Sequence, residues 1–262
     1  MTAKFLQQST SVRNKLFSMA ERAGRSGKGS HMGGSLSCLD ILVYLYFHSG
    51  FTFAPNGTSR FVLSKGHAAL CLYSVLGEYG LIDQKMLDQY PESEILLGHP
   101  TRAPGYGIEL ATGSLGMGAS YAVGLALADR LSGGHGDSRV FVLCGDGELN
   151  EGSSMEALRS AVHNKLGNLV VLVDGNKYQQ TGSVANISGI DLAAYIESLG
   201  FYVVKSAGHI YKDLKKSFDT VRTIHSPSVP MALIFETDKG RGLKDAGTNL
   251  SHHVVFNRGM IA

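Results

Sequence analysis

The stretch that decides the fold runs from Val140 to Asn176. It begins Val140-Phe141-Val142-Leu143-Cys144, continues through Gly145-Asp146-Gly147, and closes with Leu169-Val170-Val171-Leu172-Val173-Asp174-Gly175-Asn176. Two short apolar runs on either side of an amphipathic segment predict two parallel strands joined by a helix. Both strands then end at the same edge of the sheet, where ligands bind in open α/β folds. We therefore expect Asp146 and Asn176 to face one spot.

Asp146 and Asn176 have the side-chain types that hard cations prefer. Carboxylate and amide oxygens suit Mg²⁺ or Ca²⁺, and Mg²⁺ is normally completed by water and substrate phosphates. A helix that begins after Gly147 would direct free backbone N–H groups at the same place, which favours a phosphate. The stretch therefore predicts a metal-bridged diphosphate site, against the plainer alternative of two polar turns at strand ends.

Strands and helices alternate along the rest of the chain. Apolar periodicity predicts strands at 61–64, 140–144, 169–173, 201–204 and 231–236, and helices at 8–26, 37–48, 67–80, 83–90, 115–131, 190–199 and 210–224. We expect loops at 24–34 and 91–112, and a small-residue helix at 115–131 that is buried on most sides. This alternation indicates an α/β fold with a doubly wound, mostly parallel sheet, and residues 1–262 form one domain without a linker.

Composition excludes several functional classes. The net charge is +2 with no long basic run, so nothing points to nucleic acid or an anionic membrane. No window approaches 18 uncharged apolar residues, so we expect no membrane span, and the first residues lack a signal-peptide core. Cys38, Cys71 and Cys144 form no C-x-x-C pair and indicate buried thiols in a reducing compartment, which favours the cytoplasm.

Five histidines fall in loops or at predicted helix starts: His31, His67, His99, His252 and His253. Each stands beside a turn signal or another histidine, and several could converge at one sheet edge. Neutral imidazoles can donate to sugar hydroxyls, and protonated ones to a phosphate or an oxyanion. A zinc site is disfavoured because no His-x₃-His or His/Cys pairing occurs. Glu148, Glu151 and Glu156 are interpreted as helix-start charges favoured by the helix dipole.

Gly145-Asp146-Gly147, with Asn176 thirty residues after the aspartate, resembles the fingerprint of thiamine diphosphate enzymes. Four further segments are similar to transketolase motifs. Ser30-His31-Met32-Gly33-Gly34-Ser35-Leu36-Ser37 resembles Gly-His-Pro-Gly-Gly-Ser-Leu-Ser, and Leu63-Ser64-Lys65-Gly66-His67-Ala68 resembles Leu-Ser-Lys-Gly-His-Ala. Gly98-His99-Pro100 and Thr112-Gly113-Ser114-Leu115-Gly116-Met117-Gly118 match later motifs in family order. The chain therefore resembles the diphosphate-binding (PP-type) domain of transketolases.

The resemblance implies roles for individual residues. Asp146, Asn176 and the backbone carbonyl of Tyr178 would hold the metal. The cofactor-binding set would be Asn176, His67, the Gly147 N–H, one of His252 or His253, and Gly116 with Met117 near the aminopyrimidine. His31 and His99 would be catalytic, contacting the reacting end of the ketose and moving or stabilising protons. Ser30-His31-Met32 departs from the family's Gly-His-Pro, so that loop could be placed differently.

The resemblance also implies the activity. We expect transfer of a two-carbon ketol unit from a ketose to an aldose, dependent on thiamine diphosphate and Mg²⁺ (or Ca²⁺), with small sugar or sugar-phosphate substrates. The family's pyrimidine-binding and C-terminal domains, and the glutamate that activates the cofactor, have no counterpart here. We therefore expect a second subunit to supply them in an α2β2 assembly.

Three alternatives stay open: the α subunit of a 2-oxoacid dehydrogenase, a deoxyxylulose phosphate synthase-like enzyme, and a non-catalytic binding or regulatory module. The early histidine loops favour transketolase over the first. The second is normally one long chain, and the intact set of site residues argues against the third.

Overall fold

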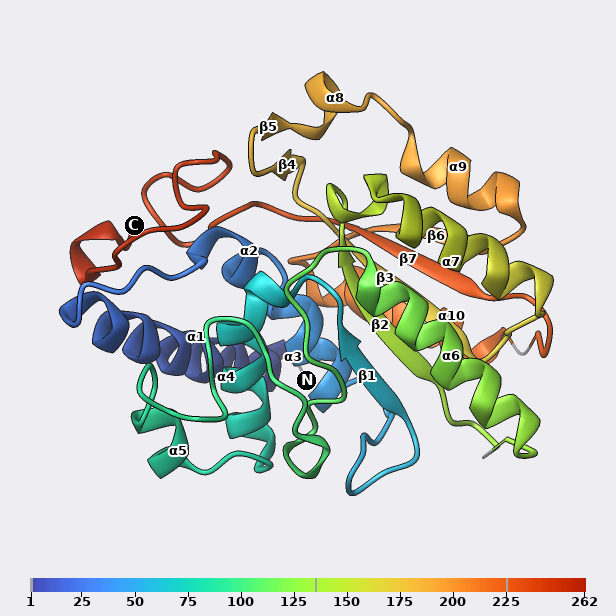
Figure 1. The fold of residues 1–262 in the computed structure, drawn as a ribbon, viewed down its shortest axis with the longest axis horizontal. Coiled ribbons are helices and arrows are strands. Elements are labelled where there is room, and N and C mark those ends of the chain that lie inside the picture. The colour runs from blue at the N-terminus through green and yellow to red at the C-terminus, as the bar shows by residue number, and fades with distance from the viewer. Residues whose placement is uncertain (1, 135, 225) are drawn as a thin grey trace.

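A computed structural model describes residues 2–134, 136–224 and 226–262. Its centre is a parallel sheet of five strands: β1 (Arg60–Leu63), β2 (Val140–Gly145), β3 (Leu169–Gly175), β6 (Tyr202–Ala207) and β7 (Met231–Glu236). The strands lie in the order β1-β2-β3-β7-β6 and every neighbouring pair is parallel (Figure 1). The predicted α/β class and parallel sheet are confirmed.

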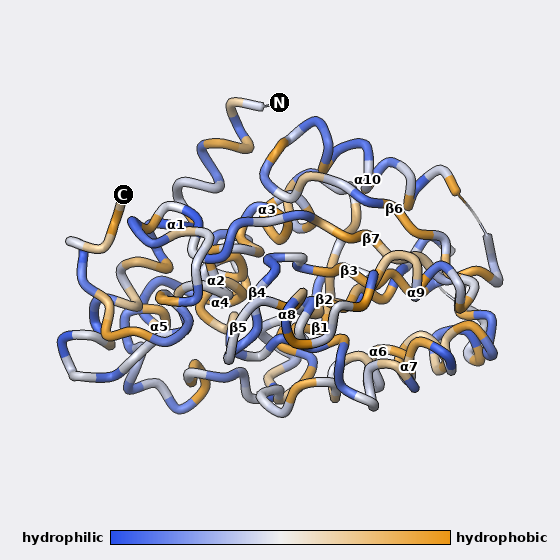
Figure 2. Tube along the Cα trace, turned by 90° about the horizontal axis from the view of Figure 1, so that it is seen from above, coloured by the Kyte–Doolittle hydropathy of each residue, from blue (hydrophilic) through white to orange (hydrophobic). Residues whose placement is uncertain are grey.

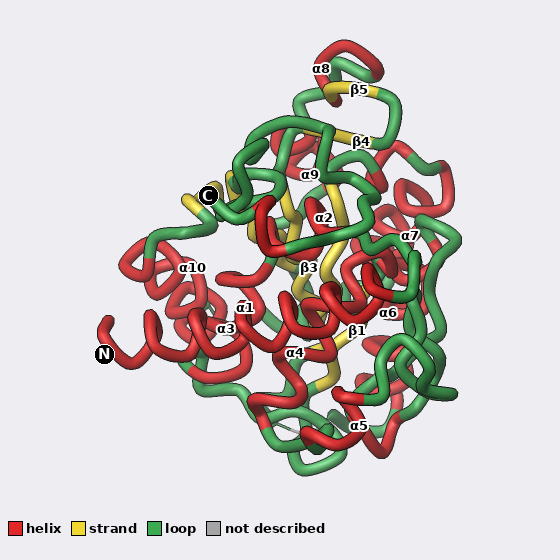
Figure 3. Tube along the Cα trace, turned by 90° about the vertical axis from the view of Figure 1, so that its left-hand side faces the viewer, coloured by secondary structure: helices red, strands yellow, loops and turns green. Residues whose placement is uncertain are grey.

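Helices cover both faces of the sheet (Figure 3). Successive side chains of a strand point to opposite faces. Accordingly, Phe141 and Leu143 pack with α1 (Thr2–Arg25), α3 (Leu39–Phe47), α4 (Ala69–Tyr79) and α10 (Tyr211–Thr223). Val140 and Val142 pack with α6 (Met117–Leu131), α7 (Gly152–His163) and α9 (Leu192–Leu199) on the other face.

The strand order explains which helix covers which face. Crossovers between parallel strands are right-handed. From β1 to β3 the chain moves in one direction along the sheet, and the connection to β6 continues that way, so α6, α7 and α9 share a face. It then returns from β6 to β7, which places α10 on the opposite face. Hydrophobic segments accordingly gather along β3 and β7 inside the molecule (Figure 2).

The longest helix begins earlier than predicted. We expected it at residues 8–26, but α1 starts at Thr2. Phe5 is buried and extends the apolar stripe of Val12 and Leu16 by two further turns. The predicted 37–48 helix is α3, and the 67–80 and 83–90 helices are α4 and α5 (Gln84–Asp88).

A short helix, α2 (Met32–Ser37), occupies the end of the stretch that we expected to be a loop. All six of its residues are buried. A Cβ added to Gly34 would lie 2.5 Å from the His67 ring, so only glycine allows the two to pack together. Close packing therefore outweighs the poor helix propensity of two glycines, which is why the local sequence did not reveal this helix.

The prediction that the small-residue helix is buried on most sides is wrong. Only one face of α6 is buried, through Gly118, Ala119, Ala122, Val123 and Ala126. Its other face, including Ser120 and Gly124, is exposed in this chain.

Short elements follow β3. A hairpin of β4 (Tyr178–Gln179) and β5 (Gly182–Ser183) leads to α8 (Val184–Ile187). Beyond β7, the tail pairs with the N-terminal part of the chain, because Ser30 and Val254 form an antiparallel bridge. Within the described ranges, no helix combines the length and apolar character that crossing a bilayer demands.

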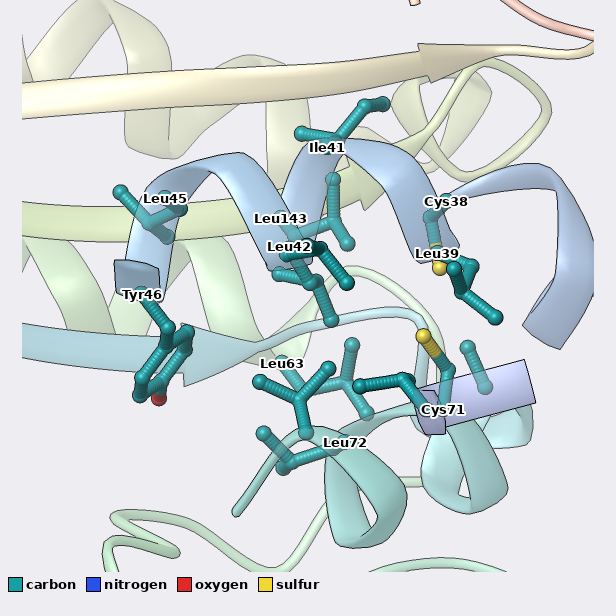
Figure 4. Close-up of a cluster of buried hydrophobic side chains, with 14 of the residues drawn as sticks. Cys38, Leu39, Ile41, Leu42, Leu45, Tyr46, Leu63, Cys71, Leu72 and Leu143 are labelled. Atoms are coloured by element: carbon teal, nitrogen blue, oxygen red, sulfur yellow. The ribbon is translucent and has the colours of Figure 1, made fainter. Parts of the chain in front are cut away.

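All three cysteines are buried free thiols, as the sequence predicted. Cys38 and Cys71 point toward one another among the leucines of α3 and α4 (Figure 4). Burial is the largest effect on Cys71 and raises the pKa of its thiol well above the usual value. Both side chains therefore belong to the packing that supports the sheet edge.

Candidate functional site

Four neighbouring strand ends bring polar side chains to one edge of the sheet. Lys65 and His67 follow β1, and Asp146 follows β2. Asn176 follows β3, and Lys239 follows β7 by three residues. Because all these strands are parallel, their carboxyl ends lie together. The predicted convergence of Asp146 and Asn176 is confirmed, since both help to line one cavity of about 290 Å³.

The backbone of the turns holds the Asp146 carboxylate in place. Its Oδ2 accepts a hydrogen bond from the Lys177 N–H at 2.6 Å, and its Oδ1 accepts one from the Gly147 N–H at 2.8 Å. Burial, followed by the neighbouring Asp174, raises the pKa of Asp146 to about 6. A bound cation would favour the ionised form of this carboxylate and so oppose the effect of burial.

Asp174 is a completely buried carboxylate at the centre of the strand ends. It forms an ion pair with the equally buried Lys65 and accepts from the Thr237 hydroxyl. Burial alone would raise the pKa of Asp174, but the Lys65 ammonium and the hydroxyl donors outweigh it and lower the pKa. Lys65 is therefore already neutralised by Asp174.

The same carboxylate fixes the orientation of Asn176. The Asn176 Nδ2 donates to Asp174 Oδ2 at 3.1 Å, and its Oδ1 accepts from the Tyr178 N–H at 3.1 Å. Because a carboxylate can only accept here, the amide nitrogen must face Asp174. The amide oxygen is thereby directed away from Asp174 and retains a lone pair for a further ligand.

Four of the predicted histidines meet at this cavity. His31, His67, His99 and His252 all line it. The His31 ring is 5.7, 5.4 and 5.3 Å from the rings of His67, His99 and His252. The tail reaches His31 because Ser30 and Val254 exchange backbone hydrogen bonds of 2.8 and 3.0 Å. Segments more than 200 residues apart thus form one cluster.

The four histidines that line the cavity are neutral at pH 7. Burial, followed by the His253 ring, lowers the pKa of His31 to about 4. Burial also lowers the pKa of His67, well below its usual value, and lowers those of His99 and His252. These rings therefore act as neutral hydrogen-bonding groups and carry no positive charge at pH 7.

The tautomer of His31 follows from its partner. Nδ1 of His31 lies 3.1 Å from the backbone carbonyl oxygen of His252. A carbonyl oxygen only accepts, so Nδ1 bears the hydrogen and Nε2 keeps its lone pair.

The structure separates the two tail histidines. His252 lines the cavity, and its Nδ1 is 3.4 Å from Lys239 Nζ. His253 is absent from the lining and instead lies beside His31, with ring centroids 4.6 Å apart. Gly116 and Met117 are likewise not lining residues, although Leu115 is, and the Met117 side chain is 54% exposed.

Sequence reasoning missed Lys239. It is buried, lines the cavity and donates to Asn249 Oδ1 at 2.6 Å. Burial, then repulsion by Lys65, lowers the pKa of Lys239 to about 8. The only sequence signal was a Lys-Gly pair that begins three residues after β7, which is not specific.

Glu148 and the turn around it differ from the prediction. The helix does not begin after Gly147: a 3₁₀ turn spans Glu148–Asn150, and α7 begins at Gly152. Glu148 is not a surface helix-start charge, since it is 2% exposed and accepts from the Gly145 N–H at 3.1 Å. The N–H groups of Gly145 and Gly147 are thus bonded within the turn, the first to Glu148 and the second to Asp146.

The residues present fit a metal-bound diphosphate. Among the described residues, no three His, Cys, Asp or Glu side chains are grouped so that they could hold a metal ion. A cation at Asp146 therefore needs amide, carbonyl, water or phosphate oxygens as well, as Mg²⁺ does. Gln179 also lines the cavity, and its Nε2 is a buried donor without a partner. A ligand acceptor would satisfy such a donor.

Known proteins share this sequence and fold. The family described as "Transketolase, thiamine diphosphate binding domain" matches residues 13–257. The chain is 35% identical to one subunit of the apulose-4-phosphate transketolase of Phocaeicola vulgatus, over 90% of this chain and 83% of that one. It is 31% identical to one subunit of the 6-deoxy-6-sulfo-D-fructose transketolase of Clostridium sp., over 95% and 90%.

Solved structures agree. Transketolase from Campylobacter jejuni superposes with a TM-score of 0.83 at 29% identity, covering 97% of this chain and 41% of that one. For transketolase from Leishmania mexicana the TM-score is 0.84 at 25% identity, with coverages of 98% and 40%. The chain thus spans about 40% of the length of these solved enzymes. By its sequence and its fold, the chain belongs to the transketolase family, within the thiamine diphosphate binding domain.

Proposed function

We propose that this chain binds thiamine diphosphate and Mg²⁺ (or Ca²⁺), and that with a partner subunit it transfers a two-carbon ketol unit from a ketose to an aldose. The observation that most supports this is the meeting of Asp146, Asn176 and four neutral histidines around one cavity at the carboxyl ends of the strands. Membership of the transketolase family points to the same chemistry.

The metal would be held by Asp146, Asn176 and the backbone carbonyl of Tyr178. A cation would offset the desolvation that raises the pKa of Asp146 to about 6. The orientation of the Asn176 amide, with its nitrogen on Asp174, leaves oxygen rather than nitrogen for the metal.

The diphosphate would be met by His67, His252, Lys239 and the Gly147 N–H. Lys239 is the cation best placed for this role, because Lys65 is already paired with Asp174. An anion beside Lys239 would reverse the lowering of its pKa and keep it charged. In this structure the Gly147 N–H donates to Asp146, so it would exchange that partner for a phosphate oxygen when the carboxylate binds metal.

The reacting end of the sugar would be met by His31 and His99. Bound thiamine diphosphate supplies the electron sink that allows a carbon–carbon bond of the ketose to break. His31 offers a lone pair at Nε2, where it could hold a proton taken from a substrate hydroxyl. Burial lowers the pKa of His99, so its ring is neutral as well. It could donate a hydrogen bond to the same substrate oxygens or accept one from their hydroxyl groups.

A partner subunit would complete the enzyme. Two of the relatives are named as transketolase subunits, and the solved transketolases are much longer than this chain. We propose that the partner supplies the pyrimidine-binding and C-terminal domains, with two copies of each chain in a cytoplasmic α2β2 assembly. The names of the relatives refer to apulose 4-phosphate and 6-deoxy-6-sulfo-D-fructose, so small sugars or sugar phosphates are the proposed substrates.

The test is purification of the chain from its native source, identification of its companion by mass spectrometry, and assay of the pair. The pair should transfer ketol units from a ketose donor and should not decarboxylate pyruvate. Asp146→Ala should abolish activity at limiting thiamine diphosphate, whereas exposed Glu197→Gln should not. Pyruvate turnover would instead support another thiamine diphosphate enzyme. No cofactor binding in the presence of the companion would support a regulatory module.

A further inference from the structure

Glu148 is a buried carboxylate that the roles above leave unused. It accepts three hydrogen bonds, from the Ser64 hydroxyl at 2.5 Å, the Gly116 N–H at 2.9 Å and the Gly145 N–H at 3.1 Å. All three donors are neutral. Burial is the largest effect on Glu148 and raises its pKa. Burying a carboxylate is costly even with these neutral donors and the nearby Lys65 ammonium, which favours its charged form.

The three donors belong to three of the chain segments that border the cavity. Ser64 immediately precedes Lys65 at the end of β1, and Gly145 immediately precedes Asp146 at the end of β2. Gly116 lies at the end of the 113–116 loop and is the residue before α6. One carboxylate therefore connects the histidine turn, the metal turn and the loop before α6.

These segments approach one another backbone to backbone. A Cβ added to Gly118 would lie 2.5 Å from Ser64 Cα, and one added to Gly66 would lie 2.8 Å from the Gly113 backbone nitrogen. At Gly118 and Gly66 there is therefore no room for a side chain between these segments. The Gly116 N–H bond to Glu148 ties the loop to the turn across this close approach.

We propose that Glu148 is a positioning residue that fixes the loop at 113–116 relative to the turn at 145–147. This inference rests on the proposed function, in which the turn meets the diphosphate. It also uses the expectation from the family resemblance that Gly116 and Met117 lie near the aminopyrimidine of the same cofactor. Holding the turn and the loop at a set separation prepares the site so that one ligand can contact both at once. Losing Glu148 should weaken recognition of the whole cofactor more than recognition of its diphosphate.

Glu148→Gln tests the proposal with almost no change in shape. A glutamine has one acceptor oxygen, and Glu148 uses one oxygen for Gly116 and the other for Gly145. In either orientation the amide nitrogen faces one of these two N–H groups and leaves it unpaired. The control is Glu197→Gln, which changes the same chemical group on the exposed side of α9.

The measurement compares two ligands on the full chain with its companion subunit. Thiamine diphosphate and inorganic pyrophosphate are titrated with Mg²⁺ by calorimetry. Glu148→Gln should raise the Kd for thiamine diphosphate at least tenfold and the Kd for pyrophosphate less than threefold, while Glu197→Gln changes neither. Equal losses for both ligands, or no loss for either, would overturn the proposal.

A second measurement needs no cofactor. By hydrogen exchange, the Gly116 amide of the wild-type protein should exchange at least a hundredfold more slowly than an exposed loop amide, and Glu148→Gln should reduce this protection at least tenfold. Ser64→Ala leaves both backbone bonds intact and should preserve it. Fast exchange of the wild-type Gly116 amide would refute the proposal even if the variant failed to fold. Failure of wild-type protein to bind thiamine diphosphate would refute the proposed function instead, and the exchange data would still decide on Glu148.

Discussion

Replacing Lys65 by methionine should destabilise the protein severely, because it leaves the Asp174 carboxylate buried without its cation. Both side chains have no exposed surface. Breaking a buried pair by removing one partner typically costs about 3–5 kcal/mol. The hydroxyl and amide donors of Ser37, Thr237 and Asn176 remain, so we expect the lower half of that range, about 3–4 kcal/mol.

The loss should depend on pH. In the wild-type protein Asp174 has a lowered pKa, so its stabilising contribution is present above the unfolded pKa and is lost only in strong acid. Without Lys65, burial dominates and the pKa of Asp174 rises. The variant can then protonate Asp174, and its deficit should shrink as the pH falls from 8 toward 5. Urea denaturation at several pH values measures both effects.

Two further variants serve as controls for Lys65→Met. Lys15→Met removes a partly exposed ion pair with Glu78 and should cost no more than about 1 kcal/mol. Lys65→Met combined with Asp174→Asn removes both charges and should recover most of the loss. If Lys65→Met cost no more than Lys15→Met, or if its deficit were the same at pH 5 and pH 8, the buried-pair reasoning would be refuted.

Three other changes test the site. Because the pKa of His31 is about 4 in the folded protein, the wild-type free energy of unfolding should rise between pH 4 and pH 6.5. His31→Asn should reduce that rise by no more than about 2 kcal/mol, since the ring is only partly buried. Urea denaturation midpoints at both pH values check this, and parallel pH profiles of variant and wild type would contradict it. The affinity for Mn²⁺, followed by electron paramagnetic resonance, should rise roughly fourfold from pH 5.5 to pH 7.5, because Asp146 ionises around pH 6. A pH-independent affinity in the wild-type protein, or an equal rise in Asp146→Asn, would count against Asp146 as a metal ligand. Gly34→Ala should destabilise the chain by about 1–3 kcal/mol, because the added methyl group would clash with the His67 ring. Gly124→Ala, which has open space around it on α6, should stabilise the chain by about 0.5–1 kcal/mol. Thermal unfolding that failed to separate the two variants would refute the packing argument.

The sequence predicted the parts of the fold that depend on local pattern. The apolar runs that became β2, β3 and β7 have no competing interpretation, and Asp146 and Asn176 follow the first two of them directly. Parallel topology then places those residues together without any knowledge of long-range packing.

The errors arose where distant contacts decide the local structure. α2 forms despite two glycines because its backbone packs on a ring from another segment. Glu148 has the sequence pattern of a helix-start charge, and its burial is caused by Ser64 and Gly116, which lie 84 and 32 residues away. Lys239 was missed because nothing near it in the sequence marks a buried ammonium.

α6 is a different case. Its small apolar residues predicted burial on most sides, yet the face that carries Ser120 and Gly124 is exposed in the isolated chain. Small residues such as Gly124 on the exposed face would let a second protein surface approach the helix backbone closely, which accords with the proposed partner subunit.

The most direct test of the account is a crystal structure of the chain with its companion, thiamine diphosphate and Mn²⁺, with the metal located by anomalous scattering. The account predicts the metal peak at the Asp146 carboxylate and the Asn176 amide oxygen, with the diphosphate beside His67 and Lys239. A metal bound elsewhere, or a cofactor that leaves the cavity between His67 and Asp146 vacant, would contradict the central claim.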